Sequence, residues 1–441
     1  MLAVVVSRAD SASERIGEQL LALGSWTEHE DTDRPDGAGG GTVYRSDGIE
    51  LRTFDALHIN ATGLASAFDD PDRLFVASRH AGDTGPLLTA HPTGNAGPAE
   101  HGGSDASFAG AAPDSLGALL DAFERHAPDG YGTAIECTHH GPTDIDCPSL
   151  FVELGSSETE WNDSAGARAV ARAILDCREP PASQRPFVGI GGGHYVPRFE
   201  RIARETDWSP GHMLVDWSLA EMAHPREATD VIRAAFERSG ARHAVVEGEY
   251  PVVCEVIESL GYRVVSETFT QTTDGVPLAT VEAIESAMTT VADGLRFGAP
   301  ATAYEGEFVV RALPETLTEE AANIDTDAAR AAVGSHALAY ETEQGGTRPT
   351  GQMGLTDESR FDRVVAALAE VLESSYETVE VKERAVIARD EQFSPEKAAT
   401  LGVGEGPAFG ALAAGESVEV DGRTIEPEVV HETRTERFPI E

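Results

Sequence analysis

Five segments of the chain carry histidines and carboxylates that could do acid-base chemistry. In chain order they supply Arg79, His80, His91 and Asn95, then Glu136, His139 and His140, then Glu153, Ser156, Ser157 and Glu158, then His194, Tyr195 and Arg198, and finally His212 and Asp216. Neutral imidazoles transfer protons, and carboxylates act as bases or orient a histidine. With glycines for close approach, these groups suit hydrolysis of an ester, in which a water is activated and an oxyanion is stabilised. The residues alone indicate a hydrolase or a nucleotide-handling enzyme.

Short apolar runs precede most of these segments and predict the strands that position them. The runs are 2–7, 73–78, 133–138, 150–155, 186–192, 212–217, 243–248 and 262–269, with helical patterns between several of them, as at 159–175 and 226–238. This alternation predicts an α/β fold, a mostly parallel sheet with helices on both faces. Because the carboxyl ends of parallel strands lie at one edge, we expect the five segments to converge in one crevice.

Two stretches interrupt the alternation, and the composition changes near residue 270. Residues 30–48 look like a mobile surface excursion, and 80–112 are too long for an ordinary connection, so that loop is either disordered or functional. Further on, apolar residues recur at helical spacing and can pack a separate core: Phe361, Val364, Val365, Leu368, Val371 and Leu372. We therefore predict one domain over 1–270 and a smaller C-terminal α+β module over 271–441.

Two motifs each have two readings. The glycine run GIGGGH at 189–194 could cradle a phosphate with its N–H groups, or could simply make a tight turn from strand to helix. It is neither a GxGxxG fingerprint nor a Walker loop. In GSSETEW, Ser157 precedes Glu160 by three residues, the spacing of a capping box, so Ser156 and Ser157 are expected to start a helix rather than to act as nucleophiles.

The adjacent histidines of THHGPT lie at a predicted strand end. Consecutive side chains of a strand point to opposite faces, so only one of His139 and His140 should enter a given site unless the backbone bends. Cys137, His139 and Cys147 could hold zinc in principle, but their spacing matches no standard zinc finger, and buried thiols are the alternative.

The chain is strongly acidic, with 33 Lys and Arg against 76 Asp and Glu and a net charge of -43. Such a field repels nucleic acid in dilute salt, whereas in molar salt the Debye length falls to about 3 Å. We interpret the composition as adaptation to high salt, typical of an extreme halophile. Four cysteines argue against a disulfide scaffold, and no apolar run is long enough to span a membrane. We expect a soluble, cytoplasmic monomer with no membrane partner.

The motifs SRHAGDTGPLLTAHPTGNAG, THHGPT, FVELGSSETEW, GIGGGHYVPRF and GHMLVDW, in this order and spacing, resemble the archaeal and plant type of D-aminoacyl-tRNA deacylase. The resemblance covers residues 1–270. It implies a catalytic domain that hydrolyses the ester between a D-amino acid and the 3'-terminal ribose of tRNA, with broad side-chain tolerance. It also implies a fold like those of nucleoside phosphorylases and peptidyl-tRNA hydrolase, D-aminoacyl-tRNA as the partner, and Zn²⁺ as the cofactor.

The resemblance also implies roles for residues at matching motif positions. The candidates for activating the water or binding metal are His140 and His194, followed by His139, His80 and His91. Glu153 is a candidate base or a carboxylate that orients a ligand. The metal ligands are left open, with His139, His140 and His194 as candidates. The remaining substrate-binding candidates are Asn95, Gly191, Gly192 and Gly193, with Arg79 and Arg198 for tRNA phosphates.

Two features depart from the shorter members of that family. Residues 168–204 hold seven Arg against three acidic residues, 7 - 3 = +4, which could be a tRNA footprint or a solvated helix face. The module at 271–441 is absent from the shorter members, and its residues 401–430 resemble a short segment of tRNase Z without that enzyme's metal-binding histidine motif. We expect no catalysis there, and the module either docks the tRNA or stabilises the protein.

Two other functions fit the residues less well. One is a nucleoside or nucleotide hydrolase or phosphorylase, which would act on free nucleosides rather than on charged tRNA. The other is a non-catalytic tRNA-binding protein, which would bind without turnover and would tolerate replacement of His140 and His194. The order of the histidine segments favours an enzyme, and the resemblance selects the substrate.

Overall fold

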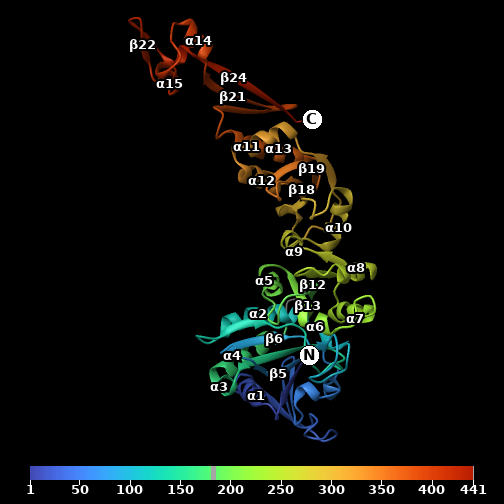
Figure 1. Cartoon of the computed structure of the whole chain (residues 1–441). Coiled ribbons are helices and arrows are strands. Elements are labelled where there is room, and N and C mark those ends of the chain that lie inside the picture. The colour runs from blue at the N-terminus through green and yellow to red at the C-terminus, as the bar shows by residue number, and fades with distance from the viewer. Residues whose placement is uncertain (180–184, 441) are drawn as a thin grey trace. The chain divides into compact units, whose positions relative to one another are not determined.

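The computed structural model describes residues 1–179 and 185–440. The chain divides into two compact units, Met1–Asp274 and Gly275–Glu441 (Figure 1). The division follows Asp274, close to the change in composition at residue 270. None of the helices in the described ranges is both long and apolar enough to cross a bilayer.

The first unit is built on a nine-stranded mixed sheet in the order β10-β6-β11-β5-β1-β4-β3-β2, with β9 beside β11. Four neighbouring strands are parallel: β11 (Pro148–Ser156), β5 (Arg73–Ala81), β1 (Leu2–Ser7) and β4 (Ile49–Phe54). Antiparallel pairings flank this group. On one side β11 pairs with β6 (Leu87–His91), which in turn pairs in parallel with β10 (Gly132–Ile135). On the other side β4 pairs with β3 (Gly41–Ser46), which pairs with the edge strand β2 (Thr27–Asp31).

Helices cover one face of this sheet. They are α1 (Ser11–Leu23), α2 (Pro113–His126) and α4 (Ser164–Asp176), which contact one another and the strands beneath them. The opposite face packs Ala3 and Val5 of β1 against residues of the short 3₁₀ segments His58–Asn60 and Leu64–Ala67 and of the loop around Ile145. The prediction of helices on both faces is therefore wrong for this sheet, because 3₁₀ turns and loops bury its second face.

A second sheet in the same unit is wholly parallel, in the order β13-β12-β14-β15. Its strands are β13 (Trp208–Leu214), β12 (Arg185–Ile190), β14 (His243–Val246) and β15 (Arg263–Val265). Val188 and Ile190 face α7 (Thr229–Ser239) and α8 (Pro251–Ser259), whereas Phe187, one residue out of phase, packs on Phe199 of α5 (Pro197–Glu205). Helices thus cover both faces of this sheet. The likeness to nucleoside phosphorylases and peptidyl-tRNA hydrolase stays a prediction.

The two irregular stretches are more ordered than the sequence suggested. Residues 30–48 contain the end of β2 and all of β3, which form an antiparallel pair. Residues 80–112 contain β6, β7 (Gly94–Asn95), β8 (Ser107–Phe108) and β9 (Gly110–Ala111). Short strands therefore replace the surface excursion expected at 30–48, because glycine and aspartate at the turns mask them in the sequence. Of the two alternatives for 80–112, disordered or functional, the second agrees with the structure, because His80, Asn95 and His101 line cavities.

The second unit is α+β, as predicted. Its antiparallel sheet β16-β18-β19-β17 comprises β16 (Arg296–Phe297), β18 (Ala339–Glu343), β19 (Arg348–Leu355) and β17 (Val309–Ala312). The helices of this unit are α10 (Leu278–Ala287), α11 (Glu315–Ile324), α12 (Thr326–Gly334), α13 (Ser359–Leu372), α14 (Pro395–Thr400) and α15 (Pro407–Ala413). Two further antiparallel groups are β20 (Thr378–Lys382), β21 (Ala385–Phe393) and β24 (His431–Pro439), and the pair β22 (Val418–Val420) and β23 (Arg423–Ile425).

The predicted apolar stripe of α13 faces the core of the second unit, with Leu368 fully buried. Replacing Leu368 by Ala should lower the free energy of unfolding by about 2 to 5 kcal/mol, because the cavity removes packing contacts as well as apolar burial. Chemical denaturation followed by circular dichroism measures the change. Exposed Glu370 on the same helix provides the control Glu370→Ala; equal stabilities of the two variants would contradict the core assignment.

Candidate active site

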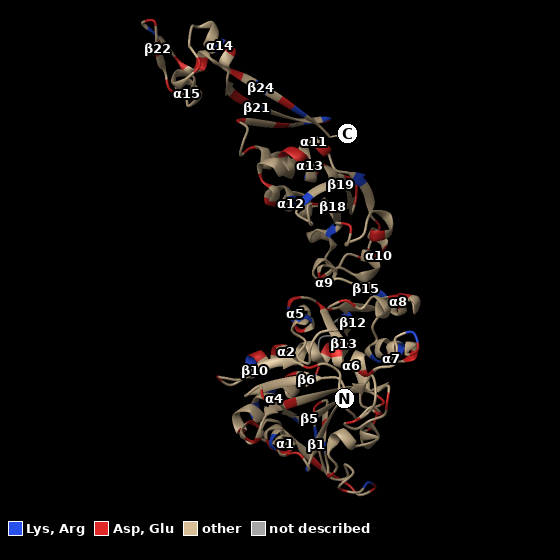
Figure 2. Ribbon diagram, viewed as in Figure 1, with Lys and Arg blue, Asp and Glu red and all other residues tan. Residues whose placement is uncertain are grey.

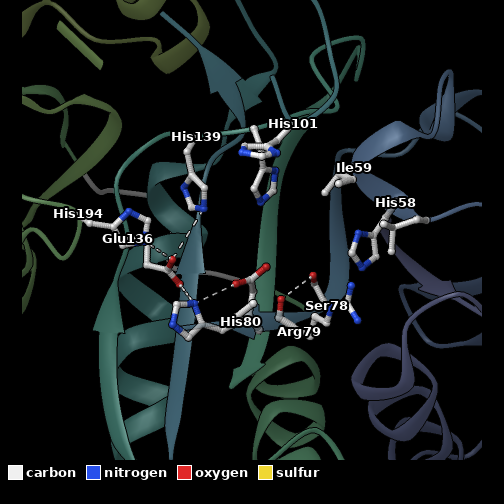
Figure 3. Close-up of a pocket in the computed structure, with 13 residues that line it drawn as sticks. His58, Ile59, Ser78, Arg79, His80, His101, Glu136, His139 and His194 are labelled. Carbon is white, nitrogen blue, oxygen red and sulfur yellow. Dashed lines mark hydrogen bonds and ion pairs between the residues drawn. The ribbon is translucent and has the colours of Figure 1, made fainter. Parts of the chain in front are cut away.

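A cavity of about 380 Å³ in the first unit collects most of the predicted site residues (Figure 3). Strand β5 supplies His80, the segment after β10 supplies Glu136 and the histidine pair, β11 supplies Glu153, and the loop after β12 supplies His194. The lining residues used below are His58, His80, Glu136, His139, His140, Glu153 and His194. The structure therefore brings side chains from both sheets to one place.

Glu136 lies at the centre of the polar network. Its Oε2 lies 2.8 Å from His194 Nε2, and its Oε1 lies 3.1 Å from His80 Nδ1. His139 Nε2 is 3.8 Å from Oε2. Burial raises the pKa of Glu136, but hydrogen bonds from His194 and His80 outweigh burial and hold that pKa well below its usual value. Glu136 is therefore an ionised carboxylate surrounded by imidazoles.

His80 carries a positive charge that balances the carboxylates of Glu136 and Glu153. Its Nδ1 also lies 3.7 Å from Glu153 Oε2, and its Nε2 lies 2.9 Å from the Tyr195 hydroxyl. Burial lowers the pKa of His80, but pairing with Glu136 and Glu153 reverses this and raises the pKa to about 10. Burial likewise raises the pKa of Glu153, whereas pairing with His80 and His91 lowers it to about 2. At neutral pH His80 is an imidazolium between two carboxylates.

Both histidines of THHGPT line this cavity, contrary to the expectation of one per site. The backbone bends at His140, whose φ is 43°, in the left-handed region that a residue with a Cβ seldom adopts. The bend cancels the alternation of an extended strand and leaves the two ring centroids 4.4 Å apart. The sequence could not indicate it, because neither residue is glycine or asparagine.

The imidazoles of His91, His139 and His140 lie close to one another. His91, His139 and His140 each have Nδ1 within hydrogen-bond distance of a backbone carbonyl, that of Pro92, Cys137 and Gly141 respectively. A carbonyl can only accept, so each Nδ1 carries a proton, and in the neutral ring Nε2 keeps its lone pair. His91 differs from the other two, because burial lowers its pKa but pairing with Glu153 outweighs burial and raises it. One ring nitrogen of each histidine lies within 4.8 Å of a ring nitrogen of the others. This arrangement suits three nitrogen ligands of one cation.

Burial keeps the histidine pair in the neutral form. It is the main cause that lowers the pKa of His140 to about 3, and it also holds the pKa of His139 well below its usual value; proximity to His91 adds to both effects. Metal ligation requires neutral imidazoles, so these two side chains need not lose a proton to bind a cation.

A cysteine lies beside this cluster, although not in the combination considered from sequence. Cys137, His139 and His194 form a second group whose ligand atoms lie within 4.8 Å of one another. Cys147 instead packs in the apolar core with Phe151. The Cys137, His139 and Cys147 set is therefore excluded by geometry, whereas His194 and His139 both remain close to candidate metal positions.

A second cavity, of about 280 Å³, adjoins the first. It shares His101, His139 and His140 with the first cavity and adds Asn95 and the half-exposed Trp217. The Asn95 amide donates to the carbonyls of Gly102 and Ser104, which fixes the loop. Asn95 therefore lies near the histidine pair but outside the cavity that holds Glu136.

The three glycines are not among the residues that line either cavity. Gly191 and Gly192 have φ of 85° and 84°, and a Cβ at Gly191 would lie 2.0 Å from the Glu247 carbonyl oxygen. Gly191 and Gly192 are therefore needed for the turn after β12, which agrees with the interpretation of GIGGGH as a tight turn. A Cβ at Gly193 would meet no atom within 4 Å. A role for Gly191, Gly192 and Gly193 in admitting adenosine stays a prediction.

The two arginines predicted for phosphate binding differ in position. Arg79 lines the first cavity with its guanidinium over the Trp161 ring, 5.0 Å from the centroid. Arg198 is outside both cavities and pairs with Glu267 at 3.1 Å, and Arg201 pairs with the same carboxylate at 2.6 Å. Glu267, which lies outside 168–204, thus balances part of the excess positive charge of that segment. Residues 180–184 of the segment lie outside the described residues.

One prediction about local structure has a clear outcome. Ser157 is the N-cap of α3 (Glu158–Trp161) and makes a capping box with Glu160, which confirms that reading. Sequence reasoning missed His58 and underestimated Glu136, which it noted but did not place in the site. His58 follows no strand pattern, whereas the spacing of Glu136 before the histidine pair was a visible signal.

Comparisons with known proteins agree with this geometry. The family model for D-aminoacyl-tRNA deacylase matches residues 67–265. A D-aminoacyl-tRNA deacylase from Natronomonas pharaonis is 55% identical over 99% of this chain and 100% of its own length. A relative of the same name from Halorubrum lacusprofundi is 51% identical, and the match covers 100% of this chain and 97% of the relative. Another, from Methanoregula boonei, is 33% identical, and the match covers 85% of this chain and 87% of the relative.

A solved structure gives an independent likeness. A crystal structure titled as a conserved protein of unknown function matches with a TM-score of 0.56 and 27% identity, covering 62% of this chain and 96% of its own. More than a third of this chain therefore has no counterpart in that structure, whereas the relatives from Natronomonas and Halorubrum match it throughout. From the matched motifs and the full-length identities, the chain belongs to the D-aminoacyl-tRNA deacylase family.

Proposed function

We propose that this protein hydrolyses the ester of D-aminoacyl-tRNA in the first cavity, with Zn²⁺ held by His91, His139 and His140. The observation that carries the proposal is the convergence of three imidazoles whose Nδ1 protons are all committed to backbone carbonyls. Broad tolerance for the amino-acid side chain and action as a cytoplasmic monomer belong to the same proposal.

The donor set fits zinc on structural grounds. His91 Nε2 is buried and has no hydrogen-bond partner among the described residues. Burial disfavours protonation of His139 and His140, so their ring nitrogens are available to a cation, whereas His91, whose pKa is raised by Glu153, would give up a proton to bind one. Zn²⁺ accepts three imidazole ligands and leaves a position open. Bound there, it would supply a Lewis acid for the ester carbonyl.

The surrounding side chains have separate tasks. Glu136 holds His194 and His80 through its two oxygens, and Glu153 lies 3.6 Å from His91 Nε2. The two carboxylates fix the imidazoles and hold a proton on His80, whose positive charge stabilises the oxyanion that forms as the carbonyl is attacked. Arg79 lines the cavity as a further cation that could meet the 3'-terminal phosphate.

The proposed reaction predicts selective release of the D enantiomer. In molar KCl, the purified protein should release labelled D-tyrosine from D-tyrosyl-tRNA at least about tenfold faster than L-tyrosine from the L form, a difference of about 1.4 kcal/mol in activation free energy. A zinc chelator should abolish the release, and added Zn²⁺ should restore it. Equal rates for the two enantiomers would contradict the substrate, and full activity of chelated, metal-free protein would contradict the zinc site.

A further inference from the structure

A buried aspartate and histidine form a pair on another wall of the cavity. His58 Nε2 lies 2.9 Å from Asp10 Oδ2, and the side chains of His58 and Asp10 are 3% and 0% exposed. His58 lines the cavity with its chain neighbours Leu57 and Ile59. Figure 3 shows His58 on the side away from His194 and Glu136.

Asp10 fixes the tautomer of His58. The Oδ1 atom of Asp10 accepts the amides of Ala12 and Ser13 and thereby caps α1, and its Oδ2 accepts the amide of Arg79. Three backbone N–H groups donate to this carboxylate, so it acts as an acceptor in its contact with His58 as well. The hydrogen between Asp10 and His58 therefore belongs to His58 Nε2. The other ring nitrogen, Nδ1, is buried and has no hydrogen-bond partner among the described residues.

Most other acid-base groups of the cavity are already engaged, and His101, which also lines it, has no carboxylate to orient its ring among the described residues. Glu136 and Glu153 pair with His80, His91 and His194, and the Nδ1 atoms of His139 and His140 donate to carbonyls. Hydrolysis needs one group that takes a proton from the water and one that gives a proton to the leaving ribose oxygen. His58 is a cavity-lining imidazole that a carboxylate orients and that keeps its second nitrogen free.

We infer that His58, oriented by Asp10, is the proton-transfer residue of the hydrolysis, an assignment that rests on the proposed function. The water oxygen bonds to the ester carbonyl carbon, and one water proton moves to His58 Nδ1. When the bond from that carbon to the ribose oxygen breaks, the same proton moves to the ribose oxygen. Asp10 stabilises the transient imidazolium without taking its proton. The products are the free amino acid and the 3'-hydroxyl of tRNA, and His58 returns to its initial state.

Replacing His58 by Ala tests this role in the full-length protein. We expect kcat for D-tyrosyl-tRNA to fall about 10²-fold or more while KM changes less than about threefold, because proton transfer acts in the transition state rather than in binding. Added imidazole should fill the space left by His58 and recover at least about a tenth of the lost rate, which a structural role would not allow. Asp10→Asn should lower kcat as well, because the side-chain amide favours the opposite tautomer of His58.

The chain contains a matched control. His126 and Asp176 form a similar pair, 2.8 Å apart and remote from the cavity lining, so His126→Gln should leave kcat unchanged. Circular dichroism and Tm identify variants that do not fold, and recovery by imidazole can come only from folded protein. Folded His58→Ala with kcat within threefold of wild type, or a loss confined to KM without recovery, would overturn the assignment. Wild-type protein that releases no D-tyrosine would instead refute the deacylase reaction, and His58 with it.

Discussion

Alanine in place of His139 is expected to lower kcat/KM for D-tyrosyl-tRNA by about 10³-fold or more, equivalent to about 4 kcal/mol of transition-state stabilisation. The ring of His139 lies 4.1 Å from that of His91, 4.4 Å from that of His140 and 4.9 Å from that of His194, measured between centroids. It also belongs to two of the three groups able to hold a metal. Its loss should therefore remove bound zinc together with activity.

Two measurements on the same preparation check this expectation. Single-turnover release of D-tyrosine gives the rate, and elemental analysis of dialysed protein gives the zinc content. His224, which is exposed, provides the control His224→Ala and should retain both. If His139→Ala kept its zinc and lost activity, His139 would contact the substrate rather than the metal. If it kept both, the proposed ligand set would be wrong.

Replacing Glu136 by Gln should lower kcat between about 10²-fold and 10³-fold without removing zinc. Gln has nearly the same shape, but it has no charge and offers only one acceptor oxygen. It can therefore no longer accept from both His194 and His80. Without the ionised carboxylate, His80 loses the stronger of the two pairings that hold its proton, and the positive charge near the ester carbonyl weakens.

The zinc content separates this effect from that of His139→Ala. Rate, zinc content and Tm should be measured together, with Glu249→Gln as the control, because Glu249 is exposed and the substitution removes the same charge. Full activity of folded Glu136→Gln would show that the buried network is structural. Loss of zinc from Glu136→Gln would instead make Glu136 a ligand.

The strands were the most predictable elements. The runs at 2–7 and 150–155 become β1 and β11, which are buried on both faces, and such strands appear in sequence as continuous apolar stretches. Neither the antiparallel pairing of β6 with β11 nor the 3₁₀ segment that carries His58 could be predicted. Both depend on contacts between residues distant in the chain.

Within the site, the types of residue were easier to predict from the sequence than the side chains with which each residue pairs. The histidines of THHGPT were visible in the sequence, but the left-handed backbone at His140 that directs both rings to one cavity was not. Similarly, the sequence suggested Arg198 as a phosphate ligand but could not show that Glu267, 69 residues away in sequence, pairs with its guanidinium. Local spacing cannot report such pairings, and they decide which charges remain available.

The pairing of these arginines affects the thermodynamics of tRNA binding. Figure 2 shows acidic residues over both units, and Glu267 occupies both Arg198 and Arg201. An arginine that neutralises a phosphate releases condensed counterions, and each such contact makes affinity fall with added salt. With Glu267 beside them, Arg198 and Arg201 would displace fewer condensed counterions from phosphates, so these two residues would contribute little ion-release entropy to complex formation. Contacts made inside the buried cavity, by contrast, keep most of their strength in concentrated salt, because buried charges are screened least.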